Sequence, residues 1–314
     1  MTIKTYEAIG YGITRIETGL VRPGLAACYV MQHENEVAII ETGTHHTVAT
    51  IMAFLESNKI EPEQVRYVIP THVHLDHAGG VGGLMARLPK AKLVIHPKGA
   101  RHMIAPEKLK AGALEVYGEE KFSQMYGDII PVAEDRVIVA EDNDTADLNG
   151  RILKFLDTPG HARHHFCVYD AVSEGVFTGD TFGLSYPELV TQDAPFLMPT
   201  TTPVQFEPEP LKASISKLMS LAPKRMFLTH YGLLESPEKW VDSLIEQINA
   251  YVTIAEHNKH SENLESDLTN ALTQYTLEKL KSHATSLSES ELHNLIKMDM
   301  TLNAQGLAVW LSRQ

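Results

Sequence analysis

The chain has 314 residues, of which 43% are apolar and 21% are charged, the content of an ordinary globular protein with a sizeable core. Its net charge of -13 argues against extended nucleic-acid binding, because such a surface repels phosphate. Two cysteines, no apolar leader and no run of about 18 apolar residues predict a cytoplasmic protein that has neither a disulfide framework nor a membrane span.

The first part of the chain predicts a sheet. Alternating and continuous apolar runs predict strands over 13–20, 27–32 and 37–40, separated by turns. Apolar residues at Val48, Ile51 and Leu55 have the spacing of an amphipathic helix, which we expect over 44–58. The apolar run 65–69 then predicts a buried strand that leads into the most polar motif of the chain.

That motif, Thr-His-Val-His-Leu-Asp-His, brings three histidines and one aspartate into six positions. Imidazole and carboxylate are the usual ligands of zinc, iron and manganese. Alternate residues of an extended segment point the same way, so His72 and His74 can bind one ion. Asp76 and His77 follow after the chain turns towards glycines, and they can serve a second ion. The motif therefore predicts a metal site at a strand end.

Further strands and helices are expected downstream. We predict a helix over 81–88, a strand over 92–96, a mostly helical insertion over 105–126, a helix over 210–221, and strands over 136–140, 152–156, 166–169, 176–178 and 225–228. Three isolated ligand candidates each follow a short apolar segment, namely His161, Asp180 and His230. His164 and Tyr186 are candidate substrate-binding residues, and Tyr186 belongs to a long irregular stretch, 181–206, of the kind that often binds ligands.

The order of strand, helix and strand, with a candidate ligand at each strand end, predicts an α+β fold. We expect a four-layer αββα sandwich with the site along one edge of the sheets. Residues 1–235 would form this catalytic domain, and residues 236–314 a helical C-terminal extension of three or four helices. The apolar faces of these helices must be buried against the sandwich or against a second chain, so a homodimer through them is one possibility.

The pattern His-x-His-x-Asp-His, followed by spaced His, Asp and His, resembles the metallo-β-lactamase superfamily of hydrolases over roughly residues 10–235. The resemblance implies that His72, His74 and His161 bind a first metal ion, that Asp76, His77 and His230 bind a second, and that Asp180 bridges the two. Glu41 stands where the family usually has aspartate, behind the ligands, so its longer side chain changes the local geometry.

Two divalent ions, with zinc, iron and manganese all compatible with this ligand set, predict hydrolysis by a metal-bound hydroxide. The substrate would be a small molecule with an ester, lactone, thioester or phosphodiester bond, and Asp76 and Asp180 would take part in catalysis. The amino-acid sequence of the motif most resembles that of the glyoxalase II and lactonase-like branch, whose members hydrolyse hydroxyacyl-glutathione thioesters or acyl-homoserine lactones.

Two alternatives remain open at the level of sequence. Related proteins use the same motif with one iron to oxidise persulfides, so a mononuclear iron dioxygenase is the second hypothesis. The third is a metal-binding regulatory protein whose helical extension mediates association and whose hydrolysis is incidental. Neither nucleic acid nor membrane is an expected partner in any of the three.

Overall fold

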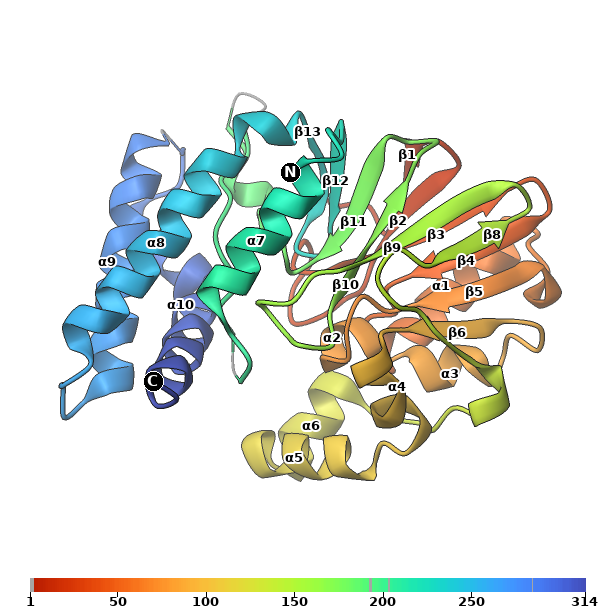
Figure 1. The fold of residues 1–314 in the computed structure, drawn as a ribbon, viewed down its shortest axis with the longest axis horizontal. Coiled ribbons are helices and arrows are strands. Elements are labelled where there is room, and N and C mark those ends of the chain that lie inside the picture. Colours follow the sequence, from red (N-terminus) through yellow and green to blue (C-terminus); the bar gives the residue numbers. More distant parts are fainter. Residues whose placement is uncertain (1–2, 192–193, 203, 284) are drawn as a thin grey trace. The chain divides into compact units, whose positions relative to one another are not determined.

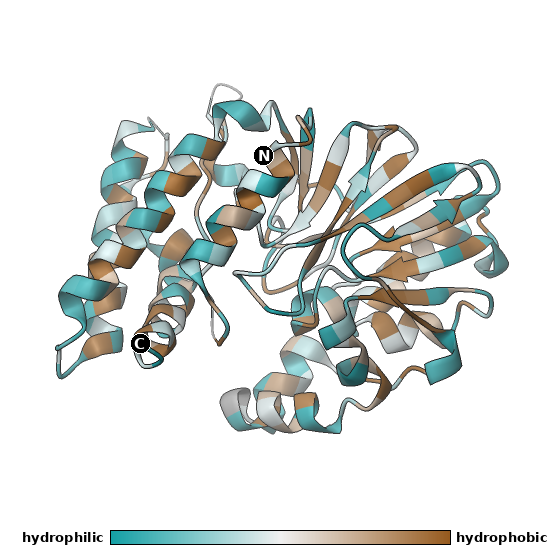
Figure 2. Ribbon diagram, viewed as in Figure 1, coloured by the Kyte–Doolittle hydropathy of each residue, from teal (hydrophilic) through white to brown (hydrophobic). Residues whose placement is uncertain are grey.

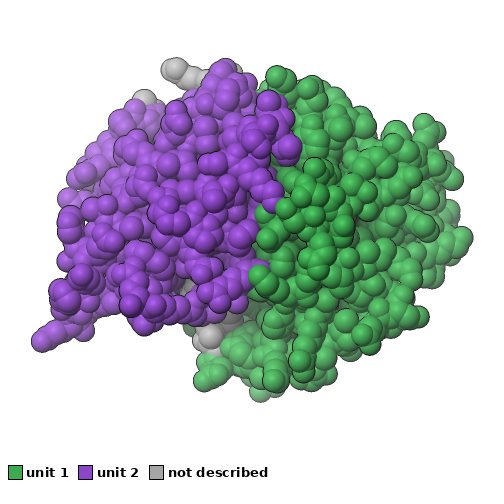
Figure 3. Space-filling model, in the orientation of Figure 1, with its two compact units in different colours: residues 1–157, 164–179, 223–235 green, residues 158–163, 180–222, 236–314 purple. Residues whose placement is uncertain are grey.

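The computed structural model describes residues 3–191, 194–202, 204–283 and 285–314. Contacts divide the chain into two units, coloured green and purple in Figure 3. Unit 1 comprises residues 1–157, 164–179 and 223–235, and unit 2 comprises 158–163, 180–222 and 236–314. The last passage from unit 1 to unit 2 falls after Glu235, but unit 2 also takes in two earlier segments. The division into domains 1–235 and 236–314 stays a prediction.

Unit 1 contains a mixed sheet whose strands follow one another in chain order (Figure 1). The described strands are β1 (Tyr6–Gly10), β2 (Ile13–Glu17), β3 (Ala27–His33), β4 (Glu36–Ile40), β5 (Val65–Ile69), β6 (Lys92–Ile95) and β7 (Val137–Val139). Strands β1 to β4 pair antiparallel, and β4 to β7 pair parallel. Since parallel strands end at the same sheet edge, the residues after β4 and β5 meet there.

A second sheet of unit 1 has the order β13-β12-β11-β10-β9-β8. Its described strands are β8 (Thr145–Leu148), β9 (Arg151–Asp157), β10 (Phe166–Asp170), β11 (Gly175–Gly179), β12 (Arg225–Leu228) and β13 (Gly232–Glu235). Strands β11 and β12 are parallel, and the other neighbouring pairs are antiparallel. The carboxyl ends of β11 and β12 therefore lie side by side, and they lead into Asp180 and His230.

Two apolar cores explain why these strands form layers. Between the sheets lie aromatic side chains, among them Phe177 and Phe227, whose rings stack with centroids 4.5 Å apart. On its other face the first sheet packs against helices, with Ile51 and Leu55 of α1 and Leu84 of α3 in one buried cluster. The described helices of unit 1 are α1 (Thr47–Ser57), α2 (Leu75–Ala78), α3 (Val81–Met85), α4 (Pro97–Ile104), α5 (Glu107–Tyr117) and α6 (Glu119–Tyr126).

Unit 2 is helical in its described part. It contains α7 (Pro208–Met219), α8 (Val241–Asn258), α9 (Leu264–Ser282) and α10 (Glu289–Leu311). Apolar residues recur along one side of α8 and α9, and Figure 2 shows them in brown among polar residues in teal. Their members Ile248, Leu268 and Leu272 are fully buried. The helical extension predicted for 236–314 is thus confirmed, and the homodimer through it stays a prediction.

The α+β class is confirmed, while several element bounds differ from the prediction. The helix expected over 81–88 ends at Met85, and the helical insertion consists of α5 and α6 with a break at Gly118. Strands β1, β8 and β13 were not predicted. The irregular stretch 181–206 holds one short 3-10 turn, Pro187–Leu189, and its residues 192, 193 and 203 lie outside the described residues. Within the described chain, none of the helices combines the length and the apolar character that a membrane span requires.

Candidate metal centre

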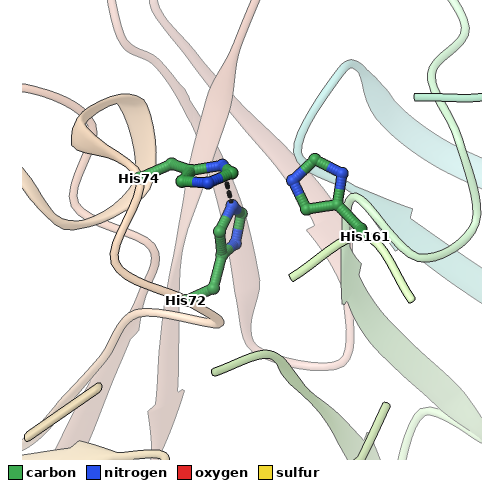
Figure 4. A group of neighbouring side chains, drawn as sticks. All are labelled: His72, His74 and His161. Carbon is green, nitrogen blue, oxygen red and sulfur yellow. Dashed lines mark hydrogen bonds between the residues drawn. The ribbon is translucent and has the colours of Figure 1, made fainter. Parts of the chain in front are cut away.

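The loop after β5 brings the imidazole rings of His72 and His74 into contact. The Nε2 atom of His72 lies 2.9 Å from the Nδ1 atom of His74, the contact dashed in Figure 4, where His161 is also drawn. Two imidazoles that share one proton in this way release it when a cation takes its place. The alternation expected from an extended segment therefore brings the two nitrogens to one point.

A second group lies on α2 and after β12, also within unit 1. It consists of Asp76, His77 and His230, whose ligand atoms all lie within 4.8 Å of one another. Oδ2 of Asp76 is 3.5 Å from Nε2 of His77 and 3.3 Å from Nε2 of His230. Ligands bound at about 2.1 Å in a tetrahedron are roughly 3.4 Å apart. The donor types and their spacing thus fit a divalent cation.

Behind these ligands lies Glu41, which follows directly after β4 and is only 1% exposed. Its carboxylate accepts hydrogen bonds from the amide and hydroxyl of Thr71 at 3.1 and 2.6 Å, and from the hydroxyl of Thr229 at 3.0 Å. Nδ1 of His77 lies 2.9 Å from the same carboxylate. A carboxylate that holds the far nitrogen of a metal-binding histidine fixes the ring and raises its basicity.

The hydrogen bonds also assign which nitrogen of each ring carries hydrogen. The hydroxyl of Thr71 donates to Glu41, so in its 3.1 Å contact with His72 it accepts from Nδ1–H. Glu41 accepts from Nδ1–H of His77, and the carbonyl of Leu25 accepts from Nδ1–H of His230 at 2.7 Å. The neutral form of each of these three rings therefore has its lone pair on Nε2.

Unit 2 contributes His161 and Asp180, with 3.4 Å between Nε2 and Oδ2. The hydroxyl of Thr200 lies 3.0 Å from Nδ1 of His161 and 3.2 Å from the carbonyl oxygen of Asp180. A carbonyl can only accept, so the hydroxyl donates to it and accepts from Nδ1–H of His161. The neutral form of this histidine, too, has its lone pair on Nε2. Gly160 precedes it with φ of +130°, where a Cβ would lie 2.2 Å from the Leu211 nitrogen.

The seven predicted ligands are thus distributed over both units. Five lie in unit 1, while His161 and Asp180 lie in unit 2. Along the sequence, Asp180 directly follows Gly179 of β11, and His161 precedes His164 by three residues. Their assignment to two ions stays a prediction.

His164 lies beside the histidines of unit 1. Its ring stacks at 15° on that of His72, with centroids 6.1 Å apart, and its Nδ1 accepts from the amide of Val73 at 3.4 Å. The ring of His102 also lies near that of His164, with centroids 6.1 Å apart, and burial and the neighbouring Arg101 both lower the pKa of His102. His164 therefore lies next to both the candidate ligand His72 and His102, and the substrate-binding role of His164 stays a prediction.

Tyr186 has a partner far along the chain. It is buried in unit 2, and its hydroxyl donates to Oδ1 of Asp299 on α10 at 2.8 Å. This contact gives the phenol a structural function that the sequence did not indicate. The predicted role of Tyr186 in substrate binding stays a prediction.

Sequence reasoning missed the groups that hold the histidines and Glu41 in place, namely Thr71, Thr200, Thr229 and the carbonyl of Leu25. A local signal was present for Thr71, which directly precedes its partner His72, whereas Thr229 donates to Glu41, 188 residues away. Thr200 and Leu25 lie 39 and 205 residues from their histidines, so no local pattern could have identified them.

Comparison with known proteins agrees with this architecture. Residues 21–230 match the family model described as metallo-beta-lactamase superfamily. The chain belongs to the metallo-beta-lactamase superfamily, as the sequence pattern predicted.

Individual relatives extend the comparison. The "Metallo-beta-lactamase fold-containing protein ST1585" of Sulfurisphaera tokodaii is 30% identical over 76% of this chain and 85% of its own. Its crystal structure superposes with a TM-score of 0.66, covering 95% of this chain and 98% of that one. A hydroxyacylglutathione hydrolase of Pelagibacter ubique is 27% identical over 42% of this chain and 41% of its own length. The Thermus thermophilus protein TTHA1429 shares the fold, with a TM-score of 0.64 at 17% identity over 98% of this chain and 95% of its own.

Proposed function

We propose that this protein is a hydrolase that uses two divalent metal ions bound by His72, His74, Asp76, His77, His161, Asp180 and His230. The observation that carries the proposal is the hydrogen-bond assignment of four histidines. In each, an acceptor engages Nδ1–H, so the neutral form of the ring has its lone pair on Nε2. A set of metal-binding histidines requires such acceptors, because an Nδ1–H that is hydrogen-bonded keeps the ring oriented with Nε2 available to the metal ion.

Two ions, rather than one, are favoured by the group Asp76, His77 and His230. This group has three ligand atoms within 4.8 Å and includes neither His72 nor His74. A centre with one iron bound elsewhere, as in the persulfide dioxygenase hypothesis, would leave this group without a metal ion, so the number of ions per chain separates the two hypotheses.

The residues supply orientation, charge and proton transfer. A pair of bound divalent ions would polarise a carbonyl or phosphoryl oxygen and activate water at neutral pH. Glu41 holds the ring of His77, and the Leu25 carbonyl holds that of His230. Asp76 and Asp180 contribute negative charge, and a carboxylate oxygen of either can carry a proton towards the leaving group. None of these steps needs a serine or cysteine nucleophile.

A thioester is the substrate class that we would test first. The supporting comparison is partial, since the matches to two hydroxyacylglutathione hydrolases cover 41% and 33% of their lengths. Lactones are the second substrate class to test, because the sequence of the motif also resembles that of the lactonase-like branch.

The first experiment measures metal content of protein purified without added metal and then tests thioesters, lactones, esters and phosphodiesters. We expect about two divalent ions per chain and a loss of kcat/KM of about 10²- to 10⁴-fold in Asp180→Ala. His293→Ala is the control, because this exposed histidine of α10 is outside the predicted ligand set.

Each outcome is decisive for one hypothesis. Failure of the reconstituted protein to bind divalent metal, or full activity of Asp180→Ala on every substrate, would overturn the proposal. About one iron per chain, with oxygen consumption on glutathione persulfide, would support the dioxygenase instead.

A further inference from the structure

One side of α10 is bonded to the segment 199–201 of unit 2. Asn303 accepts a hydrogen bond at Oδ1 from the amide of Thr201 at 2.6 Å and donates from Nδ2 to the carbonyl of Pro199 at 3.2 Å. The hydroxyl of Thr201 donates to the backbone carbonyl of Asn303 at 3.0 Å. Asn303 is 1% exposed, so losing these partners would leave buried polar groups unsatisfied.

The backbone of α10 reaches the same segment one turn later. A Cβ atom on Gly306 would lie 1.5 Å from the carbonyl oxygen of Thr201, a distance that no side chain can accept. One turn before Asn303, Asp299 accepts the hydrogen bond of Tyr186. Successive turns of α10 thus contact both the segment 199–201 and Tyr186, which lies earlier in the irregular stretch 181–206.

Thr200 lies between the two residues that Asn303 holds. Its hydroxyl, in turn, bonds to Nδ1 of His161 and to the carbonyl of Asp180, and it is 4% exposed. Displacing the backbone of 199–201 would move this hydroxyl away from both. A continuous series of buried hydrogen bonds therefore runs from α10 to two predicted metal ligands, entirely within unit 2.

We propose that α10 positions the metal ligands His161 and Asp180, with Asn303 as the positioning residue and Thr200 as the intermediary. This inference rests on the proposed function, because it assigns a role to α10 in the same metal centre. It gives the C-terminal helices a function in building the site, in addition to packing.

The test compares Asn303→Ala with the unchanged protein by chelator-competition titration of zinc and by the absorption spectrum of the cobalt-substituted protein. We expect the affinity for one of two ions to fall about 10-fold and the cobalt spectrum to change. Thr200→Val should weaken binding by about 10- to 100-fold, and Thr200→Ser, which keeps the hydroxyl, should restore it.

Two controls on α10 separate positioning from general damage. Asn294→Ala changes an exposed asparagine, and Ile296→Ala makes a cavity two turns before Asn303 at a fully buried residue. The former should leave metal affinity and melting temperature unchanged. The latter should lower the melting temperature while leaving metal affinity within about twofold, since it removes no bond to the segment 199–201.

The failures of the two proposals are distinguishable. If the unchanged protein binds no divalent metal, the proposed function fails. If it binds two ions and folded Asn303→Ala binds both with unchanged affinity and an unchanged cobalt spectrum, the role of α10 is overturned. If Asn303→Ala does not fold, Thr201→Val replaces it, because this change removes the hydroxyl bond to Asn303 at nearly constant volume. Weaker zinc binding in folded Thr201→Val would then support the role of α10, and unchanged binding would overturn it.

Discussion

Two buried carboxylates of unit 1, Asp170 and Glu41, have opposite surroundings. Asp170, at the end of β10, binds Arg151 of β9 through both oxygens, at 2.9 and 2.5 Å, and both side chains are at most 2% exposed. Burial alone would raise the pKa of Asp170, but hydrogen bonds from Arg151 and Ser173 outweigh it and hold the pKa below its ordinary value. This carboxylate has its countercharge within the chain.

Glu41 is equally buried, but its partners are an imidazole, two hydroxyls and an amide rather than a guanidinium. Its charge orients a histidine whose second nitrogen faces other ligands. A buried acid paired with arginine thus stabilises the fold, whereas a buried acid paired with histidine prepares a position for a cation. Four experiments test this distinction.

Asp170→Asn should have the largest effect on stability. It leaves the Arg151 guanidinium buried without a countercharge, so the free energy of unfolding should fall by about 3–5 kcal/mol. Urea unfolding measures this change, and metal content should stay at the level of the unchanged protein. The control is Glu235→Gln, an exposed acid that faces Arg225, with an effect within about 0.5 kcal/mol. If Asp170→Asn loses metal as well as stability, Asp170 and Glu41 do not differ in function as described above.

The difference between the unchanged protein and Asp170→Asn should depend on pH. Because folding lowers the pKa of Asp170, the stabilisation is fully present above the unfolded pKa of about 3.9 and is lost as pH falls through the folded pKa. The difference in unfolding free energy should be constant from about pH 5 to 7 and shrink below pH 4 by at most about 1.4 kcal/mol per pH unit. A difference that grows on acidification would contradict this assignment.

Glu41→Gln should act mainly on metal affinity. Its amide cannot accept from all the donors that now meet the carboxylate, so His77 loses its fixed orientation and we expect affinity to fall by about 10- to 100-fold. Zinc titration with a chelator measures this, and Glu36→Gln at the other end of β4 is the control. Unchanged affinity together with a large loss of stability would make Glu41 a second structural acid like Asp170.

Thr229→Val should have the smallest effect. It removes one of the hydrogen bonds to Glu41 at constant volume, which should cost about 1 kcal/mol of unfolding free energy. Thr229→Ser keeps the hydroxyl and should recover most of that energy. Thermal unfolding of both variants, alongside the unchanged protein, provides the measurement, and equal losses in the two would show that the hydroxyl bond does not matter.

Much of this architecture could be predicted from local sequence. The density of histidines between His72 and His77 predicted a metal site because ligand type and strand alternation act over a few residues. The apolar runs identified the central strands for the same reason. Strands β1, β8 and β13 were missed because they mix polar with apolar residues, whereas β6 and β12, which are equally short, are mostly apolar.

The support of the candidate site could not be predicted in the same way. Tyr186 and Asp299 are 113 residues apart, and Thr201 and Asn303 are 102 apart. Such pairs form only when the whole chain has folded, and their side chains carry no periodic pattern. Glu41 was identified from its place in a family motif, whereas its partner Thr229, 188 residues away, follows from the three-dimensional structure alone.

The order of synthesis gives the contact between α10 and Thr201 another consequence. All seven predicted ligands, the last being His230, leave the ribosome before Asn303 and Gly306 are made. A nascent chain that stops short of residue 303 would therefore carry every metal-binding side chain but lack the helix that holds Thr200. If α10 positions His161 and Asp180 as proposed, such a truncated product would bind metal weakly. A metal centre of full affinity would therefore form only in chains whose translation has continued through α10.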